Sequence, residues 1–329
     1  MKHKVLLTRA FQDKPIQELE SKFNLEIGSY ERNLTKDEII EKIKDKEGII
    51  TLLADPIDKE VIDSGKNLKI IANYAVGYNN IDVEYSLRKG IYITHTPDVL
   101  TEATADIAFT LLLTVARRII EANRFTVEGK FKGWEPNLML GVEISGKKLG
   151  IIGMGRIGKA FARRAKGFGL DIYYYSRNRI PMEEEKKYGA NYLELDELLK
   201  LSDFISIHTP LTKETHHLLN KEKLDMLKNT AILINTGRGP IVDEEYLIKI
   251  LRENRIFGAG FDVFEKEPFI PEELKQLDNV VILPHIGSAT IETRERMAYM
   301  CINSINDYFS GKTPENLIPE WKNKLESDG

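Results

Sequence analysis

Three stretches of the sequence carry side chains whose types suit acid–base chemistry on a small anion. Arg238 stands in NTGRGPIVDEEYL, Asp262 and Glu267 in GAGFDVFEKEP, and His285 in VILPHIGSAT. Taken alone, an arginine between glycines can simply cap a helix, and a single histidine is more often structural. Taken together, a histidine paired with a carboxylate makes a proton donor, and an arginine fork is suited to hold a carboxylate.

The elements that must position these residues alternate apolar runs with amphipathic stretches. We expect strands at residues 4–8, 48–53, 68–73, 90–96, 148–153, 171–176, 204–209, 231–236, 256–263 and 280–285. Helical patterns fall between most of them, as at 37–45, 157–169 and 244–254. This alternation predicts parallel sheets covered by helices on both faces. In such doubly wound sheets ligands bind outside the carboxyl ends of the strands, where the three stretches above lie.

The length and the longest helical patterns indicate two domains. The chain has 329 residues, which is too many for one ordinary core. A helical pattern over residues 101–130 is expected to bridge the domains, and the last one, 291–311, to return to the first. The expected division is therefore residues 1–99 with 290–329 in one domain and residues 100–289 in the other.

The composition of the chain limits its expected binding partners and its expected cellular compartment. The 47 basic residues nearly cancel the 51 acidic ones, which argues against a nucleic-acid binder. Cys301 is the single cysteine, so no internal disulfide can form and a cytoplasmic setting is expected. The N-terminal apolar run is too short for a signal peptide, and no run reaches the ~18 apolar residues of a membrane span. We therefore expect neither a membrane nor a nucleic acid as a partner.

A strand, a glycine turn and a helix are predicted in KLGIIGMGRIGKAFARR, residues 148–164. Its glycines are spaced G-x-G-x-x-G: Gly153 permits the tight turn, Gly155 lets the backbone approach a pyrophosphate, and Gly158 lets helix and strand pack closely. The helix that begins at Arg156 and Ile157 then supplies N–H groups for the phosphate oxygens. The pattern predicts dinucleotide binding, and a tight turn without a ligand is the alternative.

The next strand, in DIYYYSRNRIP, lacks the acid that such a turn usually precedes. An acid about twenty residues on would bind the ribose 2′-hydroxyl of NADH, but Ser176 stands in that region and Asp171 lies at the wrong end of the strand. A 2′-phosphate could bond Ser176 and pair with Arg177 or Arg179, of which Arg177 is nearer the strand end. NADPH is therefore the expected cofactor, with NADH possible; the alternative is a solvated basic loop.

The chain resembles the D-isomer-specific 2-hydroxyacid dehydrogenases over nearly its whole length. GMGRIGKAFARRAKGFGLDIYYYSR resembles their cofactor signature, and the three stretches described first resemble their arginine, glutamate and histidine motifs in the same order. ANYAVGYNNIDV (72–83) and TEATADIAFTLLL (101–113) match as well. The resemblance implies an α/β fold of two Rossmann-like, doubly wound parallel-sheet domains with an active-site cleft between them, assembled as a homodimer.

The resemblance also implies a role for individual residues. Arg238 would bind the substrate, His285 would be the general acid, and Glu267 would sustain the protonated imidazole during reduction of a 2-keto acid. The implied substrate-binding residues are Leu53, Val76, Gly77 and Trp134, and the further implied cofactor-binding residues are Thr104, His208, Pro210, Thr236 and Asp262. No metal is implied. The domain of residues 1–99 and 290–329 would bind substrate, and that of residues 100–289 would bind the dinucleotide.

Within the family, the sequence is most similar to glyoxylate/hydroxypyruvate reductases. The likeness rests on ANYAVGYNNID, on Trp134 and Pro136 in GWEPNLMLG, and on the serine–arginine strand end. In those enzymes the tryptophan reaches the substrate pocket of the partner subunit. The alternative for Trp134 is that it only packs at an interface. Asn79 stands where relatives often have aspartate.

Several alternatives stay open. A 2-ketogluconate reductase would need more room around Leu53, Leu100 and Trp134, and D-lactate or D-3-phosphoglycerate dehydrogenase activity is also compatible with the motifs. The phosphoglycerate enzymes tend to carry the acid that is missing after the three tyrosines. A nucleotide-sensing corepressor-like binding protein shares the fold and could keep the three catalytic residue types, so turnover must separate that class from the enzymes.

Overall fold

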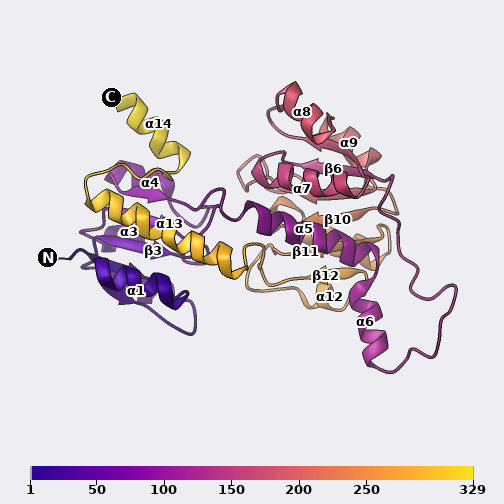
Figure 1. Ribbon diagram of the computed structural model, residues 1–329, viewed down its shortest axis with the longest axis horizontal. Helices are drawn as coiled ribbons and strands as arrows, with labels where there is room; N and C mark the ends of the chain where they lie inside the picture. Colours follow the sequence, from indigo (N-terminus) through magenta and orange to yellow (C-terminus); the bar gives the residue numbers. More distant parts are fainter. Residues whose placement is uncertain (1, 329) are drawn as a thin grey trace. The chain divides into compact units, whose positions relative to one another are not determined.

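The computed structural model describes residues 2–328, which form two compact units (Figure 1). The first unit is Met1–Leu100 with Ala289–Gly329, and the second is Thr101–Ser288. Each unit is built on one parallel sheet, of five and seven strands respectively. The predicted α/β fold of two doubly wound parallel-sheet domains is confirmed.

The sheet of the first unit has the strand order β2-β1-β3-β4-β5. Its strands are β1 Lys4–Leu7, β2 Asn24–Ile27, β3 Gly48–Thr51, β4 Ile70–Asn73 and β5 Tyr92–Thr94. Every residue of β3 and β4 is buried, as expected of central strands covered on both faces. The strand order reverses between β1 and β3, so the carboxyl ends at this point offer a natural ligand site.

In the described part of the first unit, six helices surround this sheet. They are α1 Asp13–Lys22, α2 Lys36–Ile43, α3 Lys59–Ser64, α4 Val83–Lys89, α13 Ile291–Phe309 and α14 Pro319–Asp328. The long helix α13 packs against β4 and lies beside α1 (Figure 1). Helix α14 is anchored by Trp321, whose indole N–H donates to the Ile91 carbonyl (2.9 Å) and whose ring stacks on Tyr92. The C-terminal helices therefore belong to the core of the first unit.

The sheet of the second unit has the order β12-β11-β10-β9-β6-β7-β8. Its strands are β6 Lys148–Ile152, β7 Asp171–Tyr175, β8 Ala190–Tyr192, β9 Phe204–Ile207, β10 Ile232–Asn235, β11 Gly258–Phe261 and β12 Val280–Ile282. Successive residues of β10 feed two cores, because Ile232 and Ile234 pack in one hydrophobic cluster and Leu233 in the other. The order reverses between β6 and β9, which again marks a ligand site at the carboxyl ends.

Helices pack on both faces of this second sheet. They are α5 Thr101–Ala116, α6 Ile119–Val127, α7 Arg156–Gly167, α8 Met182–Tyr188, α9 Leu195–Leu201, α10 Lys221–Leu224, α11 Glu244–Arg252 and α12 Glu272–Lys275, with a short 3-10 turn at Gly239–Ile241. Helices α5 and α7 lie side by side (Figure 1) and share one core with β6 and β10, whereas α9 and α11 contribute to the other. An ion pair between Arg164 and Asp106 (2.7 Å) joins α7 to α5.

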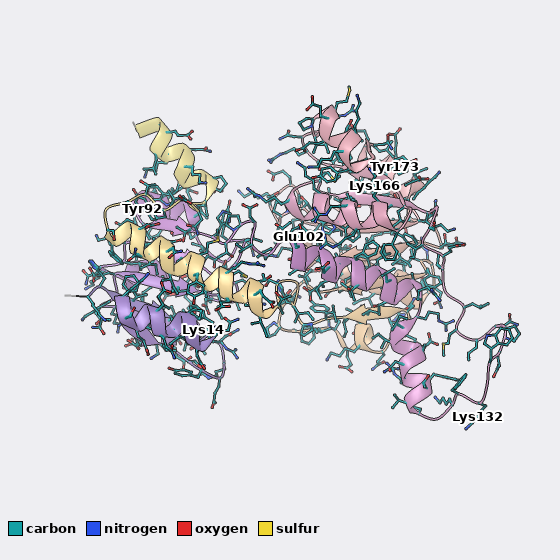
Figure 2. The ribbon with its side chains drawn as sticks, in the orientation of Figure 1. Lys14, Tyr92, Glu102, Lys132, Lys166 and Tyr173 are labelled. Atoms are coloured by element: carbon teal, nitrogen blue, oxygen red, sulfur yellow. The ribbon has the colours of Figure 1, made fainter. Side chains whose placement is uncertain are left out.

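The prediction of one continuous helix over residues 101–130 is wrong. Helix α5 ends at Ala116, and Arg118 adopts a left-handed backbone conformation (φ 53°) before α6 begins at Ile119. Helix α5 is buried along most of its length, but α6 buries none of its residues completely. The chain beyond α6 leads away from the sheet, where Figure 2 places Lys132. Among residues 2–328, no helix combines the length and apolar character that a membrane crossing requires.

Candidate functional site

The three stretches with side chains suited to acid–base chemistry follow adjacent strands of the second sheet. Strands β10, β11 and β12 are neighbours and run parallel, so all three carboxyl ends meet at one edge. Arg238 follows β10, Asp262 and Glu267 follow β11, and His285 follows β12. Strand pairing therefore gathers residues that are far apart in the sequence.

His285 and Glu267 form a hydrogen-bonded pair, with 2.8 Å between Nδ1 and Oε2. An ionised carboxylate can only accept, so Nδ1 carries the hydrogen, and Nε2 bonds no protein group among residues 2–328. The other carboxylate oxygen accepts from the backbone N–H of Phe264 (3.1 Å). Burial raises the pKa of Glu267, but the hydrogen bond and charge of His285 outweigh this effect and hold the pKa below its ordinary value. Glu267 is thus an ionised, oriented partner for the imidazole.

Asp262 holds the turn that carries His285. It is almost fully buried, and its two carboxylate oxygens accept from the backbone N–H groups of Ile286 and Gly287, both at 2.7 Å. Burial raises the pKa of Asp262 even though these two bonds oppose the shift. His285 itself has a left-handed backbone (φ 55°), a conformation that non-glycine residues adopt only where their surroundings hold them. The two bonds to Asp262 supply that restraint directly after His285.

Thr104 of α5 lies against the same turn. A methyl group added at Gly287 would come within 3.3 Å of Thr104 Cγ2 and 3.0 Å of the Asp262 carboxylate. The predicted cofactor residues Thr104 and Asp262 are therefore neighbours across this glycine. The sequence prediction for Asp262 did not foresee that its carboxylate also fixes the turn of the proposed general acid.

Arg238 is positioned by Asn235, the last residue of β10. The Asn235 side chain donates to the Arg238 carbonyl and accepts from the Gly237 N–H, each at 3.0 Å. A side chain at Gly239 would meet the carbonyl carbon of Phe264 at 1.9 Å, so this glycine lets the arginine loop lie directly on the loop that leads to Glu267. Burial lowers the pKa of Arg238, and the charge of Glu267 opposes that shift. Sequence reasoning missed Asn235, although an asparagine between a buried strand and a glycine turn is a typical loop-fixing residue.

The glycine turn after β6 has the geometry that its spacing predicts. Gly153 has φ 98°, and a side chain there would lie 2.7 Å from the Thr209 nitrogen. A methyl group at Gly158 would lie 2.2 Å from the Gly153 oxygen, so helix α7 packs tightly on the turn. At Gly155, by contrast, an added methyl would meet nothing within 4 Å. This opening lies at the start of α7, which begins at Arg156 and continues through Ile157, so the turn fits a dinucleotide pyrophosphate.

The two arginines that follow β7, Arg177 and Arg179, have different surroundings. Ser176 Oγ accepts from the Met154 N–H (2.7 Å), which ties the strand end to the glycine turn and leaves the hydroxyl hydrogen to donate. Arg179 makes two bonds to Glu185, at 2.7 and 2.9 Å. Arg177 is exposed and makes no hydrogen bond or ion pair within residues 2–328. Arg177 is thus the arginine whose guanidinium is uncommitted.

Glu185 binds Arg179 as part of a small buried network. The Tyr174 hydroxyl donates to Glu185 (2.7 Å) and accepts from the Ile180 N–H (3.1 Å). The hydrogen bonds from Arg179 and then Tyr174 lower the pKa of Glu185 to about 2. Arg179 therefore serves the loop after β7, and moving it toward a ligand would leave an ionised carboxylate without its partner.

The other predicted cofactor residues, His208, Pro210 and Thr236, follow β9 and β10 and differ in how far they are exposed to solvent. The His208 imidazole faces the fold: Nε2 lies 2.9 Å from Ser206 Oγ and the ring packs on Phe161. Burial lowers the pKa of His208 to about 3, so the ring is neutral. Pro210 is exposed. Thr236 is buried, and its hydroxyl has no partner among residues 2–328, so it can still bond a ligand.

The predicted substrate residues of the first unit follow its central strands. Leu53 comes after β3, and Val76 and Gly77 come after β4. The backbone N–H groups of Val76 and Gly77 bond no protein acceptor among residues 2–328. These two successive donors are therefore still able to bond a ligand.

Trp134 is 84% exposed on the segment that leads away from α6. The structure does not bring its ring together with His285 or Arg238 within the second unit. Groups of three or more His, Cys, Asp or Glu side chains that could hold a metal ion do not occur in the described part of the chain.

Comparison with known proteins supports one interpretation of this site. Residues 109–287 match the family model described as "D-isomer specific 2-hydroxyacid dehydrogenase, NAD binding domain". A glyoxylate reductase of Thermococcus onnurineus is 50% identical over 322 residues, which cover 97% of this chain and 96% of that protein. The structure of the TT0316 protein from Thermus thermophilus superposes with a TM-score of 0.90 at 44% identity, covering 96% of this chain and 99% of that one.

A further solved structure bears on the cofactor. It is that of an NADPH-dependent glyoxylate/hydroxypyruvate reductase from Sinorhizobium meliloti, in complex with NADP and malonate. It has a TM-score of 0.86 and 32% identity, and the match covers 97% of this chain and 98% of that one.

The glycine turn provides a matched pair of variants. We predict that Gly155→Ala leaves stability nearly unchanged, because its methyl group enters open space, but weakens dinucleotide binding about tenfold or more by keeping the phosphate from the backbone N–H groups. Gly158→Ala should instead destabilise the protein by about 1–3 kcal/mol, because its methyl group meets a backbone oxygen.

Urea unfolding without cofactor and calorimetric titration with NADPH measure the two effects. Equal loss of stability in both variants would contradict the distinction. Unchanged NADPH affinity in Gly155→Ala would place the pyrophosphate elsewhere.

Proposed function

Because the chain belongs to the D-isomer specific 2-hydroxyacid dehydrogenase family, we propose that it reduces glyoxylate or hydroxypyruvate to the corresponding 2-hydroxy acid, which is the D isomer where the product is chiral. The observation that carries the proposal is the hydrogen bond between His285 and Glu267 beside the Arg238 loop. Support for the substrate comes from relatives that carry the name glyoxylate reductase. A cytoplasmic location, expected from the single cysteine, is part of the same proposal.

In the proposed mechanism His285 is the general acid. Glu267 fixes the ring through Nδ1, so Nε2 delivers its proton to the carbonyl oxygen of the substrate. The hydrogen bond and charge of the imidazole lower the pKa of Glu267, so the carboxylate that orients the ring is ionised. The Arg238 guanidinium binds the substrate carboxylate and the carbonyl oxygen through its fork of donors. Val76 and Gly77 would add backbone N–H donors to the carboxylate, beside Leu53.

We propose NADPH as the preferred cofactor, with NADH as a weaker alternative. When bound, the cofactor supplies the hydride for the carbonyl carbon. The glycine turn would hold its pyrophosphate, and Thr104, Thr236 and Asp262 would contact the nicotinamide half. The Ser176 hydroxyl and the exposed Arg177 would bind the 2′-phosphate, and residues 176–180, which directly follow β7, include no carboxylate.

The catalytic pair generates the first functional prediction. The unaltered protein should oxidise NADPH with glyoxylate, followed by absorbance, and His285→Ala should lose at least ~100-fold in rate because the general acid is gone. Glu267→Gln should also lower the rate, because a neutral amide holds the Nδ1–H of His285 less strongly than a carboxylate does. As the pH falls, the unaltered protein should lose the ionised form of Glu267 only below the range of an ordinary glutamate, because the pKa of Glu267 is lowered.

Two sets of assays separate the remaining possibilities. Glyoxylate, hydroxypyruvate, pyruvate and 2-ketogluconate are assayed with NADH and NADPH, and D-3-phosphoglycerate, a hydroxy acid, is assayed with NAD⁺ and NADP⁺. Preference for pyruvate, 2-ketogluconate or D-3-phosphoglycerate would reassign the substrate within the family. Absence of turnover with all of them would favour a nucleotide-sensing binding protein. Near-normal rates in His285→Ala would refute its role as the acid.

The strand end after β7 generates the cofactor prediction. Arg177→Asp with Ser176→Ala should raise KM for NADPH about 10- to 100-fold, the effect of losing charged hydrogen bonds, while KM for NADH changes little. Arg179→Ala is the matched control, because Arg179 is committed to Glu185 and its loss should leave the NADPH:NADH ratio unchanged. A preference for NADH in the unaltered protein would show this interpretation to be wrong and leave the dehydrogenase assignment intact.

We also propose that the protein is a homodimer through the second unit. Exposed apolar side chains gather on α6 and the segment after it: Ile119, Ile120, Val127, Phe131, Trp134 and Leu140. Water-exposed apolar groups in such number mark an interaction surface. Trp134 would then lie at the subunit interface, where it can reach the substrate pocket of the second copy.

Light scattering tests this assembly. The unaltered protein should have twice the mass of one chain, and Val127→Glu with Phe131→Glu should reduce it to a monomer, because charges cannot be buried unpaired. Met182→Glu serves as the control: its side chain is also exposed, but it lies on α8. A monomeric unaltered protein at micromolar concentration would overturn the proposal.

A further inference from the structure

Residues 75–77, in the loop that follows β4 of the first unit, are held through their carbonyl oxygens. The bonds run from Thr96 N to Ala75 O (2.9 Å), from His95 Nδ1 to Val76 O (2.9 Å) and from Asn73 Nδ2 to Gly77 O (2.8 Å). The N–H groups of Val76 and Gly77, by contrast, bond no acceptor among residues 2–328. All the acceptors of this short stretch are thus used, and its donors are left for a ligand.

The carbonyl bonds also decide where those donors point. A trans peptide is planar, and its C=O and N–H point in opposite directions within that plane. The Val76 oxygen and the Gly77 N–H belong to the same peptide unit, so a bond to that oxygen fixes the direction of that N–H. The corresponding bond at Ala75 comes from a backbone N–H of β5's extension, which no side-chain change removes, whereas the bond at Val76 depends on the His95 side chain.

The position of His95 is fixed by further hydrogen bonds within the first unit. Its backbone exchanges two bonds with Asn316, from His95 N to Asn316 O (3.1 Å) and from Asn316 Nδ2 to His95 O (2.6 Å). Asn316 in turn accepts from the Ser304 hydroxyl of α13 (2.6 Å), and both side chains are buried. The imidazole also makes an edge contact with Tyr78, whose hydroxyl donates to Glu320 of α14 (3.1 Å). Because a carbonyl only accepts, Nδ1 carries the hydrogen in this arrangement.

We infer that His95 is a positioning residue for substrate binding: its Nδ1–H holds the Val76 carbonyl so that the Gly77 N–H donates to the substrate carboxylate. The inference rests on the proposed function, in which the Val76–Gly77 loop binds that carboxylate. In the proposed function His285 gives the proton and Arg238 bonds the carbonyl oxygen, so His95 is assigned no part in the chemical step. Its loss should therefore act on recognition of the carboxylate and leave the chemical step largely intact.

Two variants isolate the Nδ1–H donor. His95→Asn places an amide N–H at the position that Nδ1 occupies, and His95→Leu keeps a similar volume without any donor. The readout is the ratio of kcat/KM for glyoxylate to that for glyoxal, which has the same reactive carbonyl but no carboxylate. We expect the ratio to fall about tenfold in His95→Leu, the cost of a misdirected bond to a charged group, and to stay near that of the unaltered protein in His95→Asn. General damage to the fold would lower both activities together and leave the ratio unchanged, which would overturn the inference.

A binding measurement with oxamate, a non-reducible 2-oxo carboxylate analogue, separates this inference from the proposed function. With NADPH present, the backbone amide signal of Gly77 should shift on addition of oxamate in the unaltered protein and in His95→Asn, and much less in His95→Leu. An equal shift in all three proteins would overturn the role of His95. Glyoxylate turnover without any Gly77 shift would overturn the inference and leave the proposed function standing. The predicted pattern of shifts without turnover would support the inference and refute the proposed reaction.

Discussion

Two backbone N–H groups donate to the buried carboxylate of Asp262, and the geometry of the candidate site depends on these bonds. They hold the turn after β12 in which His285 has a left-handed backbone, and this conformation allows Nδ1 to meet Glu267. The cost of burying the Asp262 carboxyl appears in its raised pKa. An aspartate is well suited here, because it can accept two neighbouring N–H groups at once.

The first unit fixes its loop by the same physical means with the roles of donor and acceptor exchanged. After β12 an acidic side chain binds backbone N–H groups and thereby directs a histidine. After β4 a histidine and an asparagine side chain bind backbone carbonyls and thereby leave N–H groups for a ligand. In both places polar side chains near strand ends hold the backbone, and the rigid parallel sheet thereby fixes the direction of individual donors.

Features that depend on residues close together in the sequence could be predicted, whereas features that depend on contacts between distant residues could not. The strands of both sheets that are buried on two faces were predicted, because continuous apolar runs identify them; β2 and β8, short strands at sheet edges, were missed because polar residues interrupt them. The break at Arg118 carries no glycine or proline to announce it. The glycine turn and the motifs around Arg238, Glu267 and His285 are local patterns and could be read directly. The contact of Gly239 with Phe264, and of His95 with Val76, depends on which strands are neighbours, which only the fold determines.

Charge balance constrains the proposed chemistry. In that reaction the His285–Glu267 pair gains one negative charge when the imidazole gives its proton to the substrate oxygen, next to the cationic Arg238. The cofactor would gain one positive charge on giving up its hydride, so the two changes cancel and the net charge around the substrate carboxylate stays the same. The proposed site therefore cannot separate keto acid from hydroxy acid by net charge. The distinction rests instead on the direction of individual hydrogen-bond donors, which the bonds to Asp262 and Glu267 set.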